Sequence, residues 1–185
     1  MERADAARNR ARILEAAARL FAEKGAPNVT MDDIARAAGV GRGTLYRRYP
    51  DRAAIAVALL DEHERALQER LLRGEPPLGP GAPPAERLAA FYAAMVGLLE
   101  DHAHLVLGAE TGRSRFEVGA YGFWRAHVRA LLAAASVPEP EALVDVLLAP
   151  LDPEVYLFQR RDRGLGPEQI TAALTRLAAG VLGAG

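Results

Sequence analysis

The residues of this sequence best suited to chemistry are a cluster of hydrogen-bond donors between residues 41 and 52. The cluster consists of Arg42, Thr44, Tyr46, Arg47, Arg48 and Arg52. Arginine, threonine and tyrosine side chains donate hydrogen bonds to phosphate oxygens, and arginine also reads base edges in a DNA groove. The cluster therefore indicates a contact with nucleic acid if the chain presents these donors on one face of a helix.

A helical wheel over this segment separates an apolar side from a polar side. Leu45 and Tyr49 lie on the side expected to face a core. The opposite side carries Gly43, Thr44 and Arg47. The flanks carry Arg42, Tyr46 and Arg48. An apolar back, a groove-facing front and flanking phosphate donors are the requirements of a recognition helix, and a glycine on the front leaves room for a DNA strand.

The preceding residues predict a second short helix packed close to the first. Thr30 followed by Asp33 is a capping-box arrangement that starts a helix over residues 31–38. Gly39 ends that helix, and Gly41 can cap the next one. Two short helices joined by a glycine-containing turn of this length predict a helix-turn-helix.

Composition and charge agree with a DNA-binding head on a globular body. The 185 residues have 50% hydrophobic content and no cysteine, which excludes disulfides and thiolate chemistry. Residues 1–52 contain eleven bases and seven acids, a net charge of +4, whereas residues 53–185 carry −5. Only the head is therefore expected to meet a polyanion. No apolar run has the ~18 residues of a membrane span, and a cytoplasmic location is the expectation.

Helical periodicity continues along the chain, and the expected fold class is all-α. Residues 74–84 form a Pro- and Gly-rich loop that ends a long helix from residue 51 to about residue 73. Further helices are expected over about residues 85–101, 103–109 and 116–135, from residue 141 to a break at residue 150, from residue 153, and from residue 167 as the last helix. We expect a helix-turn-helix domain over residues 1–52, the helix 51–73 as a linker, and an effector-binding and dimerisation domain over residues 53–185.

An enzyme or metal site is the main alternative from another class. His102 and His104, with acidic residues nearby, are the candidate ligands. Those acidic residues are Glu100, Asp101 and Glu110. Two residues that are two positions apart on a helix point in different directions, and no Gly-x-Ser-x-Gly, Walker or His-Glu-x-x-His motif is present. We therefore expect no catalytic activity, no metal and no cofactor.

The first third of the chain closely resembles the DNA-binding domain of TetR-family transcriptional regulators. The matching segments are residues 12–17 (RILEAA), 20–25 (LFAEKG), 29–40 (VTMDDIARAAGV) and 43–52 (GTLYRRYPDR). The resemblance implies about nine helices, with three in the head and the fourth linking head to body. It also implies a homodimer that binds a palindromic DNA operator, most often as a repressor, and that a small molecule releases.

The resemblance assigns roles to individual residues of the head. Thr30 and Tyr46 match phosphate-contacting positions of the family, and Arg52 matches a lysine that clamps phosphate. Arg48 stands where the family usually has histidine, and Gly41 replaces the commoner serine cap. The alternative function is a helical protein that binds a small molecule or a partner without reading DNA.

The body offers candidates for a ligand site and a dimer interface. The ligand candidates are Tyr92, Met95, His102, Phe123, Trp124 and His127, together with Phe91, Leu99, Phe116 and Tyr121. Aromatic and methionine side chains with a few polar groups suit a small, largely apolar effector, and Arg115 is a further polar candidate. The dimer candidates, on the last helices, are Leu143, Leu147, Ile170, Leu174, Leu177 and Val181.

Overall fold

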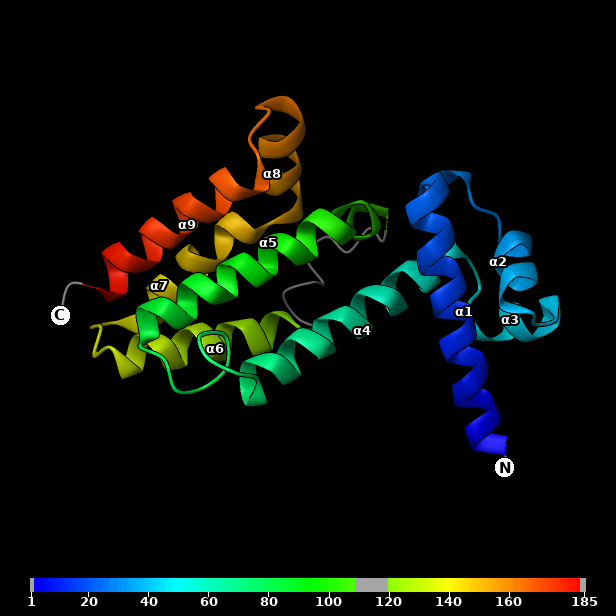
Figure 1. Ribbon diagram of the computed structural model, residues 1–185, viewed down its shortest axis with the longest axis horizontal. Coiled ribbons are helices and arrows are strands. Elements are labelled where there is room, and N and C mark those ends of the chain that lie inside the picture. Colours follow the sequence, from blue (N-terminus) through cyan, green and yellow to red (C-terminus); the bar gives the residue numbers. More distant parts are fainter. Residues whose placement is uncertain (1, 109–119, 184–185) are drawn as a thin grey trace. The chain divides into compact units, whose positions relative to one another are not determined.

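The computed structural model describes the backbone of residues 2–108 and 120–183, and every regular element in these ranges is helical (Figure 1). The elements are α1 (Glu2–Lys24), η1 (Ala26–Asn28), α2 (Met31–Ala38), α3 (Arg42–Arg48), α4 (Arg52–Arg73), α5 (Pro84–Gly108), α6 (Tyr121–Ala134), α7 (Pro140–Leu148), η3 (Ala149–Leu151), α8 (Pro153–Leu157), η4 (Phe158–Asp162) and α9 (Pro167–Leu182). The expected all-α class is confirmed.

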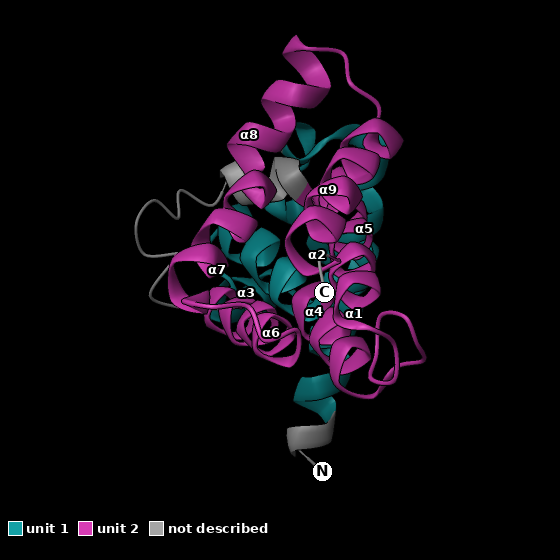
Figure 2. Cartoon of the chain, turned by 90° about the vertical axis from the view of Figure 1, so that its left-hand side faces the viewer, with its two compact units in different colours: residues 1–62, 104–110 teal, residues 63–103, 111–185 magenta. Residues whose placement is uncertain are grey.

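The chain divides into two compact units. One comprises residues 1–62 and 104–110, and the other residues 63–103 and 111–185 (Figure 2). The division thus falls inside α4, between Glu62 and His63, whereas the sequence suggested a boundary at residue 52. None of the described helices combines the length and apolar character needed to cross a membrane.

The first unit is built on an apolar stripe of α1. Ile13, Ala17 and Phe21 of this stripe are almost fully buried. They pack in one cluster with residues of the following helices, among them Ile34 of α2 and Leu45 of α3. Burial of these side chains holds the two short helices, which are too short to be stable alone.

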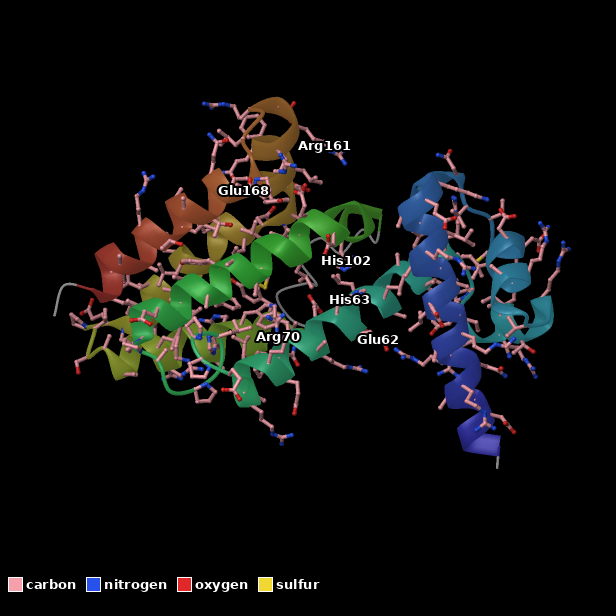
Figure 3. All side chains as sticks on the ribbon, viewed as in Figure 1. Glu62, His63, Arg70, His102, Arg161 and Glu168 are labelled. Atoms are coloured by element: carbon pink, nitrogen blue, oxygen red, sulfur yellow. The ribbon has the colours of Figure 1, made fainter. Side chains whose placement is uncertain are left out.

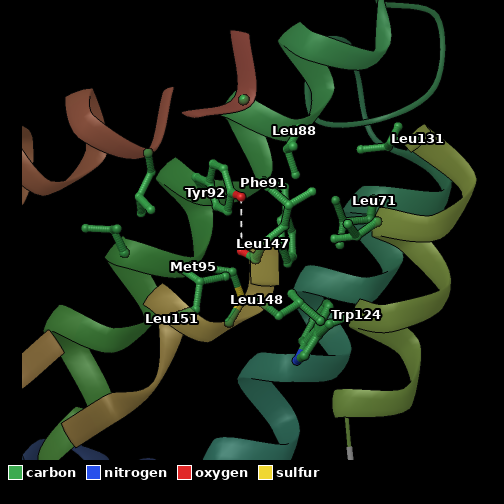
Figure 4. Packing of buried hydrophobic residues seen from close by; sticks show 14 of the residues in the cluster. Leu71, Leu88, Phe91, Tyr92, Met95, Trp124, Leu131, Leu147, Leu148 and Leu151 are labelled. Carbon is green, nitrogen blue, oxygen red and sulfur yellow. Dashed lines mark hydrogen bonds between the residues drawn. The ribbon is translucent and has the colours of Figure 1, made fainter. Parts of the chain in front are cut away.

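The second unit has its own core, formed from the second half of α4 and from α5 to α9. Phe91 and Tyr92 of α5 are fully buried at its centre. The Tyr92 hydroxyl donates to the carbonyl oxygen of Leu147 over 3.0 Å, which satisfies a polar group that would otherwise be costly to bury (Figure 4). Burial also raises the pKa of Tyr92.

Most helix boundaries follow the predicted signals, and one does not. Asp152 accepts hydrogen bonds from the backbone of Glu154 and Val155 as an N-cap, with Pro153 in the first turn, as predicted. The helix expected to end near residue 101 continues instead to Gly108. No proline or glycine interrupts residues 98–107, so the helix has no reason to stop there. The expected start of the next helix, at residues 116–119, lies outside the described residues.

A polar cluster ties α5 to the connection between α8 and α9. The Arg160 guanidinium donates to Glu100 through Nε (2.8 Å) and Nη2 (2.6 Å), and through Nη1 to the Leu165 carbonyl oxygen (2.8 Å). The Tyr156 hydroxyl also donates to Glu100. These bonds, those from Arg160 first, lower the pKa of Glu100 to about 2. The cluster therefore fixes the turn before α9 by charge-assisted hydrogen bonds.

Candidate nucleic-acid interface

The structure presents α3 with its apolar side inward, as the wheel predicted. Leu45 is fully buried and Tyr49 is 7% exposed, so both pack into the core of the first unit. Tyr46 is 49% exposed, and Arg47 is also exposed. The polar and apolar sides of the predicted recognition helix are therefore confirmed, while its contact with DNA stays a prediction.

The residues named for DNA contact occupy one exposed stretch of chain. Arg42, Gly43, Arg48 and Arg52 are exposed, and Thr44 is half-buried. Arg42 pairs with Asp32 of α2 at 2.5 Å, with 71% of its side chain exposed. A surface pair of this kind contributes little to stability, so Arg42 can exchange Asp32 for a phosphate at small cost.

The predicted capping box at the start of α2 is present and complete. Thr30 Oγ1 accepts from the Asp33 backbone N–H at 3.1 Å, and Asp33 Oδ2 accepts from the Thr30 backbone N–H at 3.1 Å. The Thr30 hydroxyl also donates to Asp33 Oδ2 over 2.6 Å. This hydroxyl and then the Thr30 N–H lower the pKa of Asp33. In this arrangement the Thr30 hydroxyl proton points to Asp33, so a phosphate contact by the side chain requires the hydroxyl to rotate.

Arg52, expected to clamp a phosphate, makes bonds within the head. Its Nη1 donates to the carbonyl oxygens of Ala26 (3.0 Å) and Val29 (2.9 Å). These carbonyls precede α2, whose N-cap is Thr30. Arg52 therefore fixes the entrance of the helix-turn-helix, a role that the family pattern did not suggest.

Arg12 is a second positioning residue that the sequence reasoning missed. Its Nη2 donates to the carbonyl oxygen of Gly39 over 2.8 Å. Gly39 has φ 61° and ψ 40°, the left-handed conformation that ends α2. The bond spans 27 residues, so no local pattern could reveal it. Arg12 thus holds the turn between α2 and α3 from α1.

The expected ligand residues fall into two groups within the second unit. Tyr92, Met95 and Trp124 are at most 7% exposed and belong to its core. The Phe91 ring lies 5.7 Å from Trp124 and 5.3 Å from His127, and Phe123 packs edge-on against Trp124 at 5.4 Å. Five expected residues, Tyr92, Met95, Phe123, Trp124 and His127, thus lie in or against one aromatic core. Arg115 and Phe116 lie outside the described residues.

His102 lies apart from that group. Its ring stacks on the His63 ring of α4, with centroids 4.0 Å apart and planes inclined by 18° (Figure 3). Glu100, another of the candidate metal ligands, accepts hydrogen bonds from Arg160 and Tyr156. The side chain of His104 and the whole of Glu110 lie outside the part of the chain that the structure describes. Within residues with described side chains, no three His, Cys, Asp or Glu residues are grouped to hold a metal ion.

The expected dimer residues differ in their exposure in the single chain. Leu147, Ile170 and Leu174 are 1%, 3% and 6% exposed in the single chain. They pack in the core of the second unit, so they face their own chain. The partly buried members are Leu143, Leu177 and Val181. Larger apolar exposure on the same part of the chain belongs to Val146 (60%), Val155 (42%) and Phe158 (52%).

Comparison with known proteins identifies the head most directly. The family described as "Bacterial regulatory proteins, tetR family" matches residues 13–59. An uncharacterized HTH-type transcriptional regulator of Mycobacterium tuberculosis (strain H37Rv) is 33% identical over 124 residues. That alignment covers 67% of this chain and 59% of the relative. The chain thus spans less than two thirds of the length of this curated relative.

Solved structures extend the likeness of fold to nearly the whole chain. A putative transcriptional regulator from Saccharomonospora viridis, solved in complex with choline, has a TM-score of 0.71 and 23% identity, covering 91% of this chain and 94% of that one. The fatty acid degradation regulator FadR from Bacillus halodurans has a TM-score of 0.66 and 17% identity, covering 95% of each chain. These structures show the shared fold, and the family match over the head together with the curated relative shows that the chain belongs to the TetR family of bacterial regulatory proteins.

Proposed function

We propose that the protein is a transcriptional repressor that binds a palindromic DNA operator as a homodimer in the cytoplasm. The observation that carries the proposal is the division of α3, with Leu45 fully buried and Arg47 exposed on the opposite side. A short helix so anchored can enter a major groove and present its front to base edges. The phosphate donors proposed around it are Thr30, Arg42, Tyr46, Arg48 and Arg52.

Homodimerisation follows from the size of this contact. One recognition helix of seven residues is too small for tight and specific binding. Two heads related by a two-fold axis read two half-sites, which gives a palindromic operator. Val146, Val155 and Phe158 of the second unit supply exposed apolar surface that a second copy could cover.

We further propose that a small, largely apolar effector controls DNA binding from the second unit. The aromatic core around Phe91 and Trp124 has the composition that such a ligand needs. Helix α4 belongs to both units, with Arg52 at its start and Leu71 in the core of the second unit. An effector acts only if it binds DNA-competent and DNA-incompetent forms unequally. The choline complex of the Saccharomonospora viridis protein shows a small ligand in a chain of this fold.

The test is selection of genomic DNA fragments by the purified protein, followed by binding titrations over a range of salt concentrations. We expect a selected palindrome, with an affinity that falls linearly on a logarithmic salt scale. A scrambled site of equal length is the control, and the protein should bind it less tightly than the palindrome. Undetectable or salt-insensitive binding would refute the regulator and favour the alternative, a small-molecule- or partner-binding protein.

A further inference from the structure

Among the buried side-chain nitrogen atoms of the second unit that lack a hydrogen bond, two belong to Arg87 and His127. Arg87 Nε of α5 and His127 Nε2 of α6 are both buried, and neither has a hydrogen-bonding partner among the described residues. The rest of the Arg87 guanidinium is held in place, because Nη2 donates to the Leu71 carbonyl oxygen of α4 over 3.3 Å. Buried donors without partners are costly, so such a pair needs an explanation.

The two groups lie near the same residue of the aromatic core, Phe91. Arg87 precedes Phe91 by one turn of α5, which places both side chains on one face of that helix. The His127 ring lies 5.3 Å from the Phe91 ring. Arg87 has no carboxylate within ion-pair distance in the described part of the chain, so its charge has no protein counterion there. An imidazole and, one helical turn from Phe91, a charged donor thus lie near the Phe91 ring, which packs against Trp124 (Figure 4).

We propose that Arg87 and His127 together bind the carboxylate of a monoanionic effector, whose apolar body contacts Phe91 and Trp124. This inference rests on the proposed effector response and names the ligand's chemical class. The Arg87 Nε–H and the His127 Nε2–H each donate to the carboxylate. The oxyanion supplies the acceptors that both groups lack, and its charge balances that of Arg87.

The number of charges favours a carboxylate over a phosphate monoester. Burial, and then the charge of Arg87, lowers the pKa of His127 to about 4. The imidazole is therefore neutral at pH 7, and the pair offers one positive charge. A dianion would bring an uncompensated charge into an apolar environment, which is costly. A neutral alcohol would leave the charge of Arg87 without a partner.

The test uses the full chain without DNA and three probes of the same length: decanoate, decan-1-ol and decyl phosphate. Calorimetry should show decanoate binding more tightly than both other probes. Arg87→Met and His127→Gln should each weaken decanoate binding about tenfold or more, because each removes a hydrogen bond to a charged group. Arg129→Gln is the control, since it removes a charge from an exposed residue of the same helix α6.

Two further readouts separate a ligand site from a structural pair. On decanoate addition, the ¹⁵N resonances of the His127 ring, assigned with His127→Gln, should shift. Arg87→Met should unfold at the same temperature as the natural chain or above it, because it removes a half-buried charge that has no counterion among the described residues. Equal binding of decan-1-ol, tighter binding of decyl phosphate, or decanoate affinity unchanged in both variants overturns the proposal.

Failure of decanoate, octanoate and phenylacetate to bind at all overturns it too. These outcomes are independent of the regulator proposal. A chain that binds its operator but no carboxylate refutes only the ligand class. A chain that binds carboxylate but no DNA refutes only the regulator.

Discussion

Arg52 Nη1 lies 2.9 Å from the carbonyl oxygen of Val29, so the first residue of α4 is bonded to the residue just before the N-cap of α2. This bond closes the helix-turn-helix at its two ends, because Val29 precedes α2 and Arg52 follows α3. Arg52, for which a phosphate contact is proposed, therefore also orders the helix-turn-helix itself.

We predict that Arg52→Ala destabilises the head by about 1–2 kcal/mol, because two carbonyl oxygens lose a charged donor. It should also weaken binding to every DNA sequence. Denaturant unfolding and fluorescence anisotropy with cognate and random DNA measure the two effects. A salt slope flatter by about one unit indicates that Arg52 also contacts phosphate, and an unchanged slope indicates positioning alone. Unaltered stability and affinity would contradict both roles.

Arg47 and Arg48 should behave differently although they are neighbours. Arg47→Ala should cost about 1–3 kcal/mol at the selected operator and little on random DNA, because Arg47 is proposed to contact a base edge. Arg48→Ala should weaken binding to operator and random DNA by similar factors, because Arg48 is proposed to contact a phosphate. Competition titrations with operator and random duplexes check this pair. The opposite result would assign the base contact to Arg48 and the phosphate contact to Arg47.

Gly43 and Gly39 provide matched glycine tests within one motif. A Cβ at Gly43 meets nothing within 4 Å, so Gly43→Ala should raise stability by up to about 1 kcal/mol through helix propensity. It should nevertheless weaken DNA binding if a strand approaches this point. Gly39→Ala should lower stability, because φ is +61° and the new Cβ lies 2.5 Å from Arg12 Nη2. Thermal unfolding and operator titration measure both. A Gly43→Ala protein with full affinity would remove Gly43 from the interface.

The dimer proposal predicts that Phe158→Arg yields monomers of normal stability, because an exposed apolar side chain becomes charged at the covered surface. Leu174→Arg should unfold the second unit instead, since Leu174 lies in its core. Val57→Arg, at an exposed residue of the first unit, is the control that should leave assembly unchanged. Light scattering after gel filtration gives the masses. A dimeric Phe158→Arg protein would place the interface elsewhere.

Stability should fall as the pH is lowered from about 6.5 towards 4 because of His127. Its pKa is lowered from 6.5 to about 4, so the unfolded chain binds more protons than the folded one in this interval. The expected loss is on the order of 2 kcal/mol. Denaturant unfolding between pH 5 and pH 8 measures the free energy of unfolding. This free energy should change less steeply with pH for His127→Gln than for the natural chain. Equal slopes would exclude His127 as the source of this pH dependence.

Glu100, with a lowered pKa, contributes stability above pH 4.5 that is lost towards pH 2.

Local features of the sequence predicted the head well. The Thr30–Asp33 box, the Gly39 stop and the two sides of α3 each depend on residues at most a few positions apart, and all three are confirmed as structure. The bonds from Arg12 to Gly39 and from Arg52 to Val29 join residues 27 and 23 positions apart. Periodicity and capping rules contain no information on such pairs.

The packing of the second unit was harder to predict, because an apolar stripe on a helix does not show which surface it packs against. Ile170 and Leu174 were expected at a seam between two chains, but the same stripe packs into the chain's own core. Arg87 escaped notice for a similar reason. One arginine near the start of a helix is ordinary in sequence, and only the fold shows that its Nε is buried beside the aromatic core.

Trp124 gives the molecule a built-in optical probe. It is the one tryptophan of the 185 residues, it is 4% exposed, and it stands in the second unit against Phe91 and Phe123. Its fluorescence therefore reports on the second unit alone, while the first unit, which has no indole, is silent at excitation near 295 nm. Comparison of this emission with far-ultraviolet circular dichroism, to which both units contribute, would reveal whether the two units melt together or in sequence, without any label.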